Sequence, residues 1–295
     1  MTMMKRLSLI FALLMLAVAS QAQLLWKVTG NNLPRPSYIL GTYHLAPASM
    51  LDEIPGIDQA LEGCDVVVGE LDKEDMKDPN GMMGLVSLMM APADSTLDKL
   101  YTPEQYQVIE QVFNKYCSGM GLSLGMMTRL KPEAVSMLIT VMRTGLMEPD
   151  NTNLIDIGVQ ERGSKMGRAT MGLETLQEQA ELMFSAPIAD QAQRLLKACE
   201  EDDVQQEMSQ ELKDAYMSQD LEKLEAAFNE SADAEMNEDM MESLLTRRNN
   251  NWVVKLVKMM PERSCLVCVG AGHLFGDQGL LQLLRAEGYT VEPMK

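Results

Sequence analysis

Two stretches that end in glycine and histidine decide the fold of this chain: Tyr38-Ile-Leu-Gly-Thr-Tyr-His44 near its start and Cys265-Leu-Val-Cys-Val-Gly-Ala-Gly-His273 near its end. Each is a short apolar run that stops at a glycine and then reaches a histidine. Runs of this length and composition, bounded by glycine, predict buried β-strands. The simplest arrangement that buries both strands is one sheet formed from the two ends of the chain.

Four more runs of β-forming residues extend the predicted sheet, at Leu24–Val28, Val66–Leu71, Arg168–Leu173 and Tyr289–Val291. Helix-forming sequence lies between the predicted strands, as in the segment from Leu51 to Gly63, which follows the run that starts at Tyr38 and closes with a glycine before Val66. Parallel strands need crossover connections of this kind. The predicted fold class is therefore α/β, with a mainly parallel central sheet built from both termini and a long α-helical insertion.

The middle of the chain is predicted to be helical. Thr102-Pro-Glu104 is a good helix start, and helical patterns also cover about residues 187–216 and 220–260. We place the helical insertion at about residues 75–260, interrupted by the short strand near residues 168–173.

Residues 1–22 have the features of a secretory signal peptide. Lys5 and Arg6 precede an uncharged, mostly apolar run, and small residues before Gln23 predict cleavage at that point, with a second acceptable site after Ala19. The run is short for a membrane span, although an uncleaved anchor is the alternative. We therefore expect residues 23–295 to form a single exported domain, periplasmic or secreted, without a stable transmembrane anchor.

Charge excludes one class of partner. The chain has a formal net charge of -18, and loss of a leader that carries Lys5 and Arg6 would make the charge more negative still. A protein this acidic repels phosphate backbones, so nucleic acid is not an expected partner. Neither the oligomeric state nor the identity of a peptide or small-molecule substrate follows from the composition.

The five cysteines cannot all pair with one another. Cys265 and Cys268 form a CxxC pattern, but they lie in a predicted strand, where an offset of three sends the two side chains to opposite faces. This geometry disfavours both a disulfide and a shared metal ion. Buried core positions are the better interpretation, and the sequence leaves Cys64, Cys117 and Cys199 undecided.

Polar side chains follow four of the predicted strands, each beside or shortly after a glycine. They are His44, Glu70, Glu174 and His273. In an open parallel sheet, ligands bind beyond the carboxyl ends of the strands, so these four residues are expected on one rim of the sheet. His44 and His273 are also the only two histidines in the chain, and both stand in Gly-x-x-His. Structural histidines, each satisfied by its own neighbours, are the alternative interpretation.

Two imidazoles and a carboxylate are a common ligand set for a catalytic divalent ion. We therefore predict a metal site formed by His44, Glu70 and His273, with Glu70 or Glu174 as the general base. Glu70 cannot freely do both, so the two roles compete. The chain contains no His-Glu-x-x-His motif, which argues against a zincin.

Four motifs together resemble the TraB/GumN family, which is related to the TIKI metalloproteases: Gly41-Thr-Tyr-His44, Val67-Val-Gly-Glu70, Arg248-Asn-x-x-Trp252 and Gly270-Ala-Gly-His273. The resemblance covers nearly all of the chain after the leader. It implies an erythromycin esterase/ChaN-like α/β fold with a helical insertion. For the TIKI branch it also implies peptide-bond hydrolysis that depends on manganese or cobalt.

Carried over to this chain, the resemblance makes His44, Glu70 and His273 the catalytic centre. Arg248 and Asn249 match the Arg-Asn element of the family, and either could steady a developing oxyanion, although a solvated helix face is the simpler explanation. Asp156 fits a helix surface as well as it fits a role at the rim.

The leading functional prediction is an exported metal-dependent hydrolase, most favourably a peptidase, that uses a manganese, cobalt or zinc ion. The alternative is an envelope protein that binds haem, a metal or a peptide without turnover, with Tyr43 and His44 as haem ligands. A structural envelope protein with a vestigial site is a third interpretation.

Overall fold

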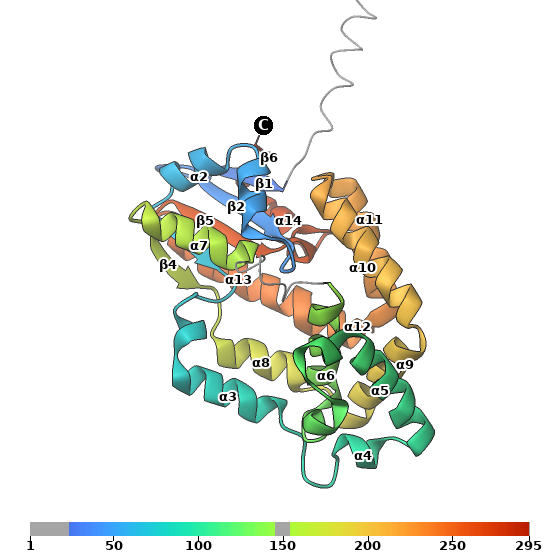
Figure 1. The fold of residues 1–295 in the computed structure, drawn as a ribbon. Coiled ribbons are helices and arrows are strands. Elements are labelled where there is room, and N and C mark those ends of the chain that lie inside the picture. Colours follow the sequence, from blue (N-terminus) through green and yellow to red (C-terminus); the bar gives the residue numbers. More distant parts are fainter. Residues whose placement is uncertain (1–23, 145–153, 295) are drawn as a thin grey trace, which may run out of the picture.

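A computed structural model of the 295-residue chain describes residues 24–144 and 154–294. The predicted signal peptide lies outside the described residues. Figure 1 shows the sheet at one end of the molecule, with a large helical region beside and below it.

The central sheet has six strands in the order β4-β3-β5-β2-β1-β6. Their bounds are β1 (Leu25–Gly30), β2 (Ser37–Thr42), β3 (Val66–Gly69), β4 (Ala169–Gly172), β5 (Cys265–Gly270) and β6 (Tyr289–Pro293). Neighbours pair in parallel from β4 to β2, and β1 is antiparallel to both of its neighbours. The predicted mainly parallel α/β fold is confirmed, and β5 from the C-terminal end lies between two N-terminal strands.

The one reversed strand, β1, results from a short connection. Gly30, Asn31 and Asn32 all have positive φ angles (82°, 46° and 59°), which glycine and asparagine tolerate best. This tight reversal leads β1 directly into β2 and leaves no room for a crossover helix. The sequence prediction did not include this hairpin.

Helices fill both the flanks of the sheet and the insertion. Helices next to the sheet in sequence are α2 (Ile57–Gly63), α7 (Ile155–Lys165), α13 (Arg247–Met259) and α14 (Leu280–Ala286), and those of the insertion are α3 (Pro79–Met89), α4 (Leu97–Leu100), α5 (Pro103–Cys117), α6 (Pro132–Arg143), α8 (Leu176–Phe184), α9 (Ile188–Glu200), α10 (Asp202–Met217), α11 (Leu221–Glu235) and α12 (Glu238–Met241). Short 3-10 helices include η1 (Ala48–Glu53) and η6 (Ala271–Leu274), and a π-helical turn, η5 (Glu242–Thr246), precedes α13.

Two of the long helices predicted for the insertion are divided in the structure. The pattern over residues 187–216 breaks at Glu201, between α9 and α10, and that over residues 220–260 breaks at Met236, whose backbone is extended. The two helices on either side of each break pack in different cores, but both are amphipathic, so a hydrophobic period of 3.6 residues does not show where one helix ends and the next begins. The helix start at Thr102 is as predicted, with a full capping box formed by Thr102 and Gln105.

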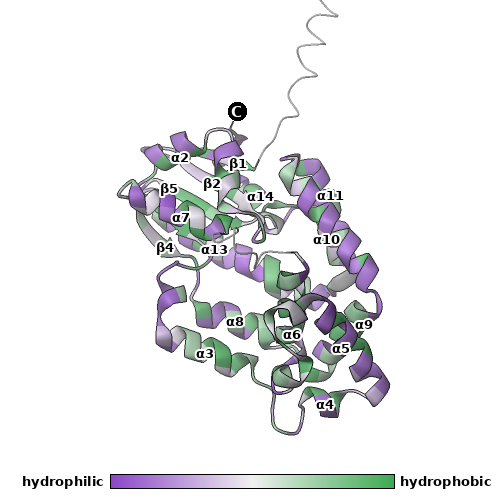
Figure 2. Ribbon diagram, in the orientation of Figure 1, coloured by the Kyte–Doolittle hydropathy of each residue, from purple (hydrophilic) through white to green (hydrophobic). Residues whose placement is uncertain are grey.

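Both faces of the sheet are buried, which explains the continuous apolar character of β2 and β5. One face packs against α2, α7, α10 and α11, and the other packs against α13 and α14. Cys268 belongs to the first core and Cys265 to the second, as the predicted offset requires. All five cysteines are buried and unpaired. The central strands are neutral to hydrophobic in colour, whereas α10 and α11 carry many hydrophilic residues (Figure 2).

A separate core holds the far part of the insertion together. It is formed by α5, α6 and α9, with Ile109, Phe113, Val135 and Leu195 among its buried members. Because this core does not use the sheet, the insertion packs largely on itself. At the carboxyl edge of the sheet, α8, α10, α11 and the turn before α13 line a cavity.

Candidate active site

The topology brings four predicted site residues to one edge of the sheet. Glu70 directly follows β3, Glu174 follows β4, His273 lies in η6 after β5, and His44 follows β2. These four strands are parallel neighbours, so their carboxyl ends share an edge. Residues far apart in sequence therefore meet there.

Glu70 lies between the two histidines. Its Oε1 atom is 3.7 Å from Nε2 of His44 and 3.7 Å from Nε2 of His273, and it accepts a hydrogen bond of 2.8 Å from the backbone N–H of Gly270. Two ligand atoms of one ion with metal–ligand bonds near 2 Å lie at most about 4 Å apart. Oε1 of Glu70 is within that distance of each imidazole nitrogen, so the carboxylate is close enough to share an ion with either histidine.

Gly270 makes this close approach possible. A Cβ atom at that position would stand 2.9 Å from Nε2 of His44 and 3.4 Å from Oε1 of Glu70. Any larger residue would push apart the imidazole and the carboxylate. The glycine is required here by lack of space, because its φ angle is an ordinary negative one.

His44 is held by a carboxylate on the neighbouring helix. Its Nδ1 atom is 3.0 Å from Oδ2 of Asp156, and the hydroxyl of Thr42 donates to the other oxygen of Asp156 at 2.6 Å. Asp156 lies in the first turn of α7, so the structure places it at the rim and not on an unrelated helix surface. The negative charge of Asp156 raises the pKa of His44 to about 9.

His273 has the opposite surroundings. Its side chain is 4% exposed, packs against the Trp252 ring at 4.4 Å, and directs Nδ1 to Oδ1 of Asn249 at 2.7 Å. Because the amide oxygen can only accept, Nδ1 carries the proton and Nε2 keeps its lone pair. Burial lowers the pKa of His273 to about 3.

Arg248 ties the two glutamates together. Its guanidinium donates to Oε2 of Glu70 at 2.5 Å and to Oε1 and Oε2 of Glu174 at 2.6 and 3.2 Å. The same group lies 4.5 Å above the Trp252 ring, and its Nη1 atom is 3.0 Å from Nε2 of His273. Burial alone would lower the pKa of Arg248, but the two carboxylates outweigh it and raise the pKa.

The groups around Glu70 also set its protonation state. Burial alone would raise its pKa, but His44, His273, Arg248 and the Gly270 N–H outweigh burial and lower the pKa to about 2. Glu70 is therefore ionised at neutral pH.

Glu174 and Asn249 reach the cluster but not its cavity. Both oxygens of Glu174 accept from Arg248, and the Asn249 amide donates to the carbonyl oxygens of His273 and Gln278. Neither residue lines the cavity beside the histidines. The structure thus places these two residues behind the groups that face a substrate.

One contributor was missed from the sequence. The amide of Gln179, in α8, donates to Oε2 of Glu70 at 3.0 Å and to Oε1 of Glu174 at 3.1 Å. Its only sequence signal is its position, five residues after Glu174 and within the next helix. That signal is too weak to distinguish it from Gln177, the other glutamine of α8.

The donor atoms have the chemistry that a divalent ion needs. Two ligand atoms that each bind a tetrahedral ion at about 2.1 Å lie about 3.4 Å apart, close to the 3.7 Å found here. Each imidazole also has its other nitrogen held by an acceptor, a common arrangement behind metal ligands. However, Arg248 already contacts Nε2 of His273, and no three His, Cys, Asp or Glu side chains in residues 24–144 and 154–294 stand in a ready metal-binding arrangement.

A cavity of about 350 Å³ opens beside this cluster. His44, Glu70, Arg248 and His273 form one part of its wall. The remaining wall is mainly apolar and comes from α8, α10, α11, η5 and the segment after β5.

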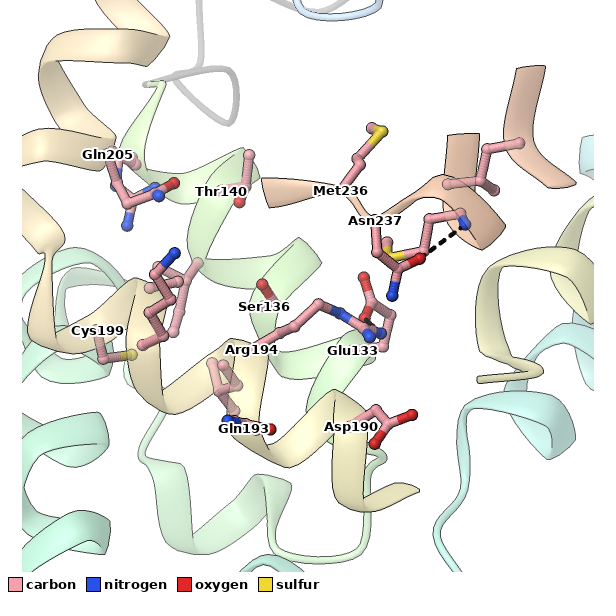
Figure 3. Close-up of a pocket in the computed structure, with 17 residues that line it drawn as sticks. Glu133, Ser136, Thr140, Asp190, Gln193, Arg194, Cys199, Gln205, Met236 and Asn237 are labelled. Atoms are coloured by element: carbon pink, nitrogen blue, oxygen red, sulfur yellow. Dashed lines mark hydrogen bonds and ion pairs between the residues drawn. The ribbon is translucent and has the colours of Figure 1, made fainter. Parts of the chain in front are cut away.

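A larger cavity, of about 620 Å³, lies away from the cluster, between α6, α9 and α12 (Figure 3). Two of its charged side chains, Arg194 and Glu133, form an ion pair at 2.9 Å. It contains no histidine. The smaller cavity is therefore the better candidate for chemistry.

The family comparison covers nearly all of the described chain. The chain belongs to the TraB/PrgY/gumN family, whose model matches residues 24–293. The family resemblance predicted from the sequence is confirmed.

Three relatives show the range of similarity, and all are named as TIKI metalloproteases or homologues. The chain is 23% identical to Metalloprotease TIKI2 of Danio rerio over 91% of its own length, 22% identical to Metalloprotease TIKI1 of Homo sapiens over 87%, and 21% identical to Metalloprotease TIKI homolog of Amphimedon queenslandica over 92%. The matches span 60%, 59% and 62% of those proteins, so this chain corresponds to about three-fifths of each. No solved structure matches the chain significantly.

The described part of the chain offers no membrane-crossing helix, because none of its helices is both long and apolar enough.

Proposed function

We propose that this protein is a metal-dependent hydrolase, and specifically a peptidase. The observation that carries the proposal is the position of Glu70 Oε1, which lies 3.7 Å from the Nε2 atoms of both histidines. The names of the TIKI relatives support a metalloprotease-like role.

His44, Glu70 and His273 would hold the ion through two nitrogen atoms and one carboxylate oxygen. A divalent ion bound there would polarise the scissile carbonyl and lower the pKa of a bound water. Manganese, cobalt and zinc all suit this donor set. For His273 to take part, its contact with Arg248 must open.

The residues around these ligands would orient the imidazoles, stabilise negative charge and accept a proton. Asn249 and Asp156 orient the two imidazoles through their Nδ1 atoms. Arg248 faces the cavity and is the candidate that stabilises negative charge on the substrate oxygen. Glu70, ionised and beside both imidazoles, is the candidate base if it does not bind the ion itself. Glu174 then serves to hold Arg248 in place.

We further propose that the protein is exported, into the periplasm or out of the cell. The support is the charged, apolar and small-residue pattern of residues 1–22. Mass spectrometry of the N-terminus, after expression with the full leader, tests this directly. A mature chain that begins at Gln23 is the expected result, and an intact Met1 in exported material would contradict cleavage.

Metal content and turnover can be tested together. Purified mature protein is expected to bind about one divalent ion per chain and to cleave members of a mixed peptide library in the presence of manganese, cobalt or zinc. His44→Ala and His273→Ala should each lose the ion and the cleavage. Met83→Ala, an exposed position on α3, is the matched control and should keep both. Unchanged metal content in both histidine variants would contradict the proposed metal-dependent hydrolase.

A binding protein without turnover is the second candidate, because the same cavity combines a histidine with apolar walls. Addition of haem to the purified protein separates the two. A Soret shift that His44→Ala abolishes, together with no peptide cleavage, would favour the haem-binding alternative.

A further inference from the structure

The cavity beside the histidines has two chemically different parts. One part contains the charged side chains that line it, His44, Glu70 and Arg248, together with the neutral imidazole of His273. The other part is lined by large apolar side chains, namely Leu182, Met183, Leu212, Phe228, Met236, Leu244, Leu245 and Phe275. A ligand that fills the cavity must therefore be polar at one end and apolar at the other.

The apolar part keeps hydrophobic surface that the fold leaves uncovered. Leu182, Leu212, Phe228 and Phe275 are each only partly buried, although they converge on one cavity. The Tyr216 hydroxyl, which belongs to the same cavity wall, already donates to the carbonyl oxygen of Gly41 at 3.1 Å. A ligand thus finds apolar contact there and little to hydrogen-bond with. Covering such surface stabilises a complex.

Phe228 brings this apolar wall close to the reacting groups. Its ring lies against the backbone beside His273, because a Cβ atom at Gly272 would be 2.6 Å from Cε2 of Phe228. Phe228 also pairs with Phe275, with 5.6 Å between ring centroids. A group held against Phe228 would therefore be next to the imidazole, and not at a distant subsite.

We propose that this apolar part is a specificity pocket for a large aliphatic or aromatic side chain next to the scissile bond of a peptide. The inference rests on the proposed peptidase function and adds to it the substrate class. The charged end would receive the peptide group, and the leucine, phenylalanine or methionine beside that group would enter the pocket of Phe228 and Leu182. A volume of about 350 Å³ is at the small end of the range for ligand pockets, as expected for one side chain with its flanking backbone.

The pocket walls come mostly from the helical insertion. Leu182 belongs to α8, Leu212 to α10 and Phe228 to α11, whereas the histidines follow strands of the sheet. The sheet edge would then supply the chemistry and the insertion would select the substrate. Replacement of wall residues should change which peptide is cleaved without removing the histidine cluster.

The first test compares peptides that differ at one residue. A quenched fluorescent heptapeptide series with Leu, Phe, Ala or Asp at the centre is assayed with the manganese-loaded protein. We expect kcat/KM to be at least about tenfold higher for Leu and Phe than for Ala, since even one methylene in an apolar pocket gives about 10-fold discrimination or more. Phe228→Ala and Leu182→Ala should each reduce the Leu-to-Ala ratio several-fold, and Phe228→Leu should restore much of it.

The ratio of kcat/KM for the Leu peptide to kcat/KM for the Ala peptide also defines the control and the outcomes that would contradict the pocket. Met83→Ala should leave the ratio unchanged, and thermal unfolding of each variant shows that it is folded. A wild-type ratio within twofold of unity would overturn the pocket while leaving the peptidase function intact. So would an unchanged ratio in folded Phe228→Ala and Leu182→Ala.

A binding measurement separates failure of the pocket from failure of the enzyme. If no peptide is cleaved, calorimetric binding of N-acetyl-leucinamide and N-acetyl-alaninamide is compared in the wild type and in Phe228→Ala. A leucine preference that Phe228→Ala abolishes would support the pocket while rejecting hydrolysis. Equal binding of the two amides, or much tighter binding of decanoate than of either amide, would overturn the proposed substrate class.

Discussion

His44 and His273 occupy the same place in the same motif, yet their surroundings are opposite. The His44 side chain is 57% exposed and contacts Asp156, whereas the His273 side chain is 4% exposed and contacts Asn249. The pKa of His44 is raised to about 9 and that of His273 is lowered to about 3. The Gly-x-x-His motif therefore fixes where an imidazole lies, and the neighbouring helices fix whether it carries a proton.

The buried half of the site, around His273, is held together by a network of hydrogen bonds and ion pairs. Arg248 contacts Glu70, Glu174 and His273 within one desolvated cluster. The exposed half consists of His44 with one carboxylate that water can also reach. Substitutions should consequently cost more stability on the His273 side than on the His44 side.

Removal of the guanidinium should have the largest effect. Arg248→Met leaves Glu70 and Glu174 buried without their cation, which typically costs about 3–5 kcal/mol. Denaturant unfolding monitored by circular dichroism measures the loss. Arg247→Met is the matched control, because Arg247 is exposed on the same helix and should change stability by less than about 0.5 kcal/mol. Equal stability of the two variants would contradict the network.

Loss of the amide behind His273 should have a smaller effect. Asn249→Ala leaves Nδ1 of the buried imidazole without an acceptor, at a cost of about 1–3 kcal/mol. It should also weaken metal binding about 10–100-fold, since this amide fixes the imidazole tautomer. The exposed neighbour Asn250 provides the control, and Asn250→Ala should bind metal as the wild type does.

The two histidines should make the free energy of unfolding depend on pH in opposite directions. His273 binds fewer protons when folded, so its contribution is lost as pH falls from the unfolded pKa near 6.5 toward 3. His44 binds more protons when folded, so its contribution is present below about 6.5 and lost as pH rises toward 9. Free energies of unfolding of the metal-free protein across pH 4–9 test both signs. Stability that rises steadily from pH 6.5 to 9 would contradict the second.

The smallest change in stability is expected for a substitution beside His44, in the exposed half of the site. Asp156→Asn removes the charge that raises the pKa of His44, so this pKa should fall from about 9 toward 6.5. Because the chain has only two histidines, NMR titration of the imidazole protons resolves both directly. The His273 signal is the internal control and should not titrate above pH 5. A His44 pKa that stays near 9 would show that another group sets it.

The sequence alone determined the strands and their order of appearance, because short apolar runs bounded by glycine have few other stable conformations. It also determined that the residues after those strands share an edge, since parallel strands end on the same side. Hence His44, Glu70, Glu174 and His273 were predicted together. The β1–β2 hairpin and the breaks at Glu201 and Met236 were not, because a hydrophobic period does not reveal where backbone direction changes.

Only the tertiary structure decided whether each of the two histidines is cationic or neutral. Asp156, Asn249, Arg248 and Gln179 approach the cluster from α7, α13 and α8, and their orientations depend on how these helices pack. A sequence motif specifies the spacing of residues along the chain, whereas desolvation and charge act through space. For this reason the Gly-x-x-His pair identified the site, but burial and helix packing made one imidazole cationic and the other neutral.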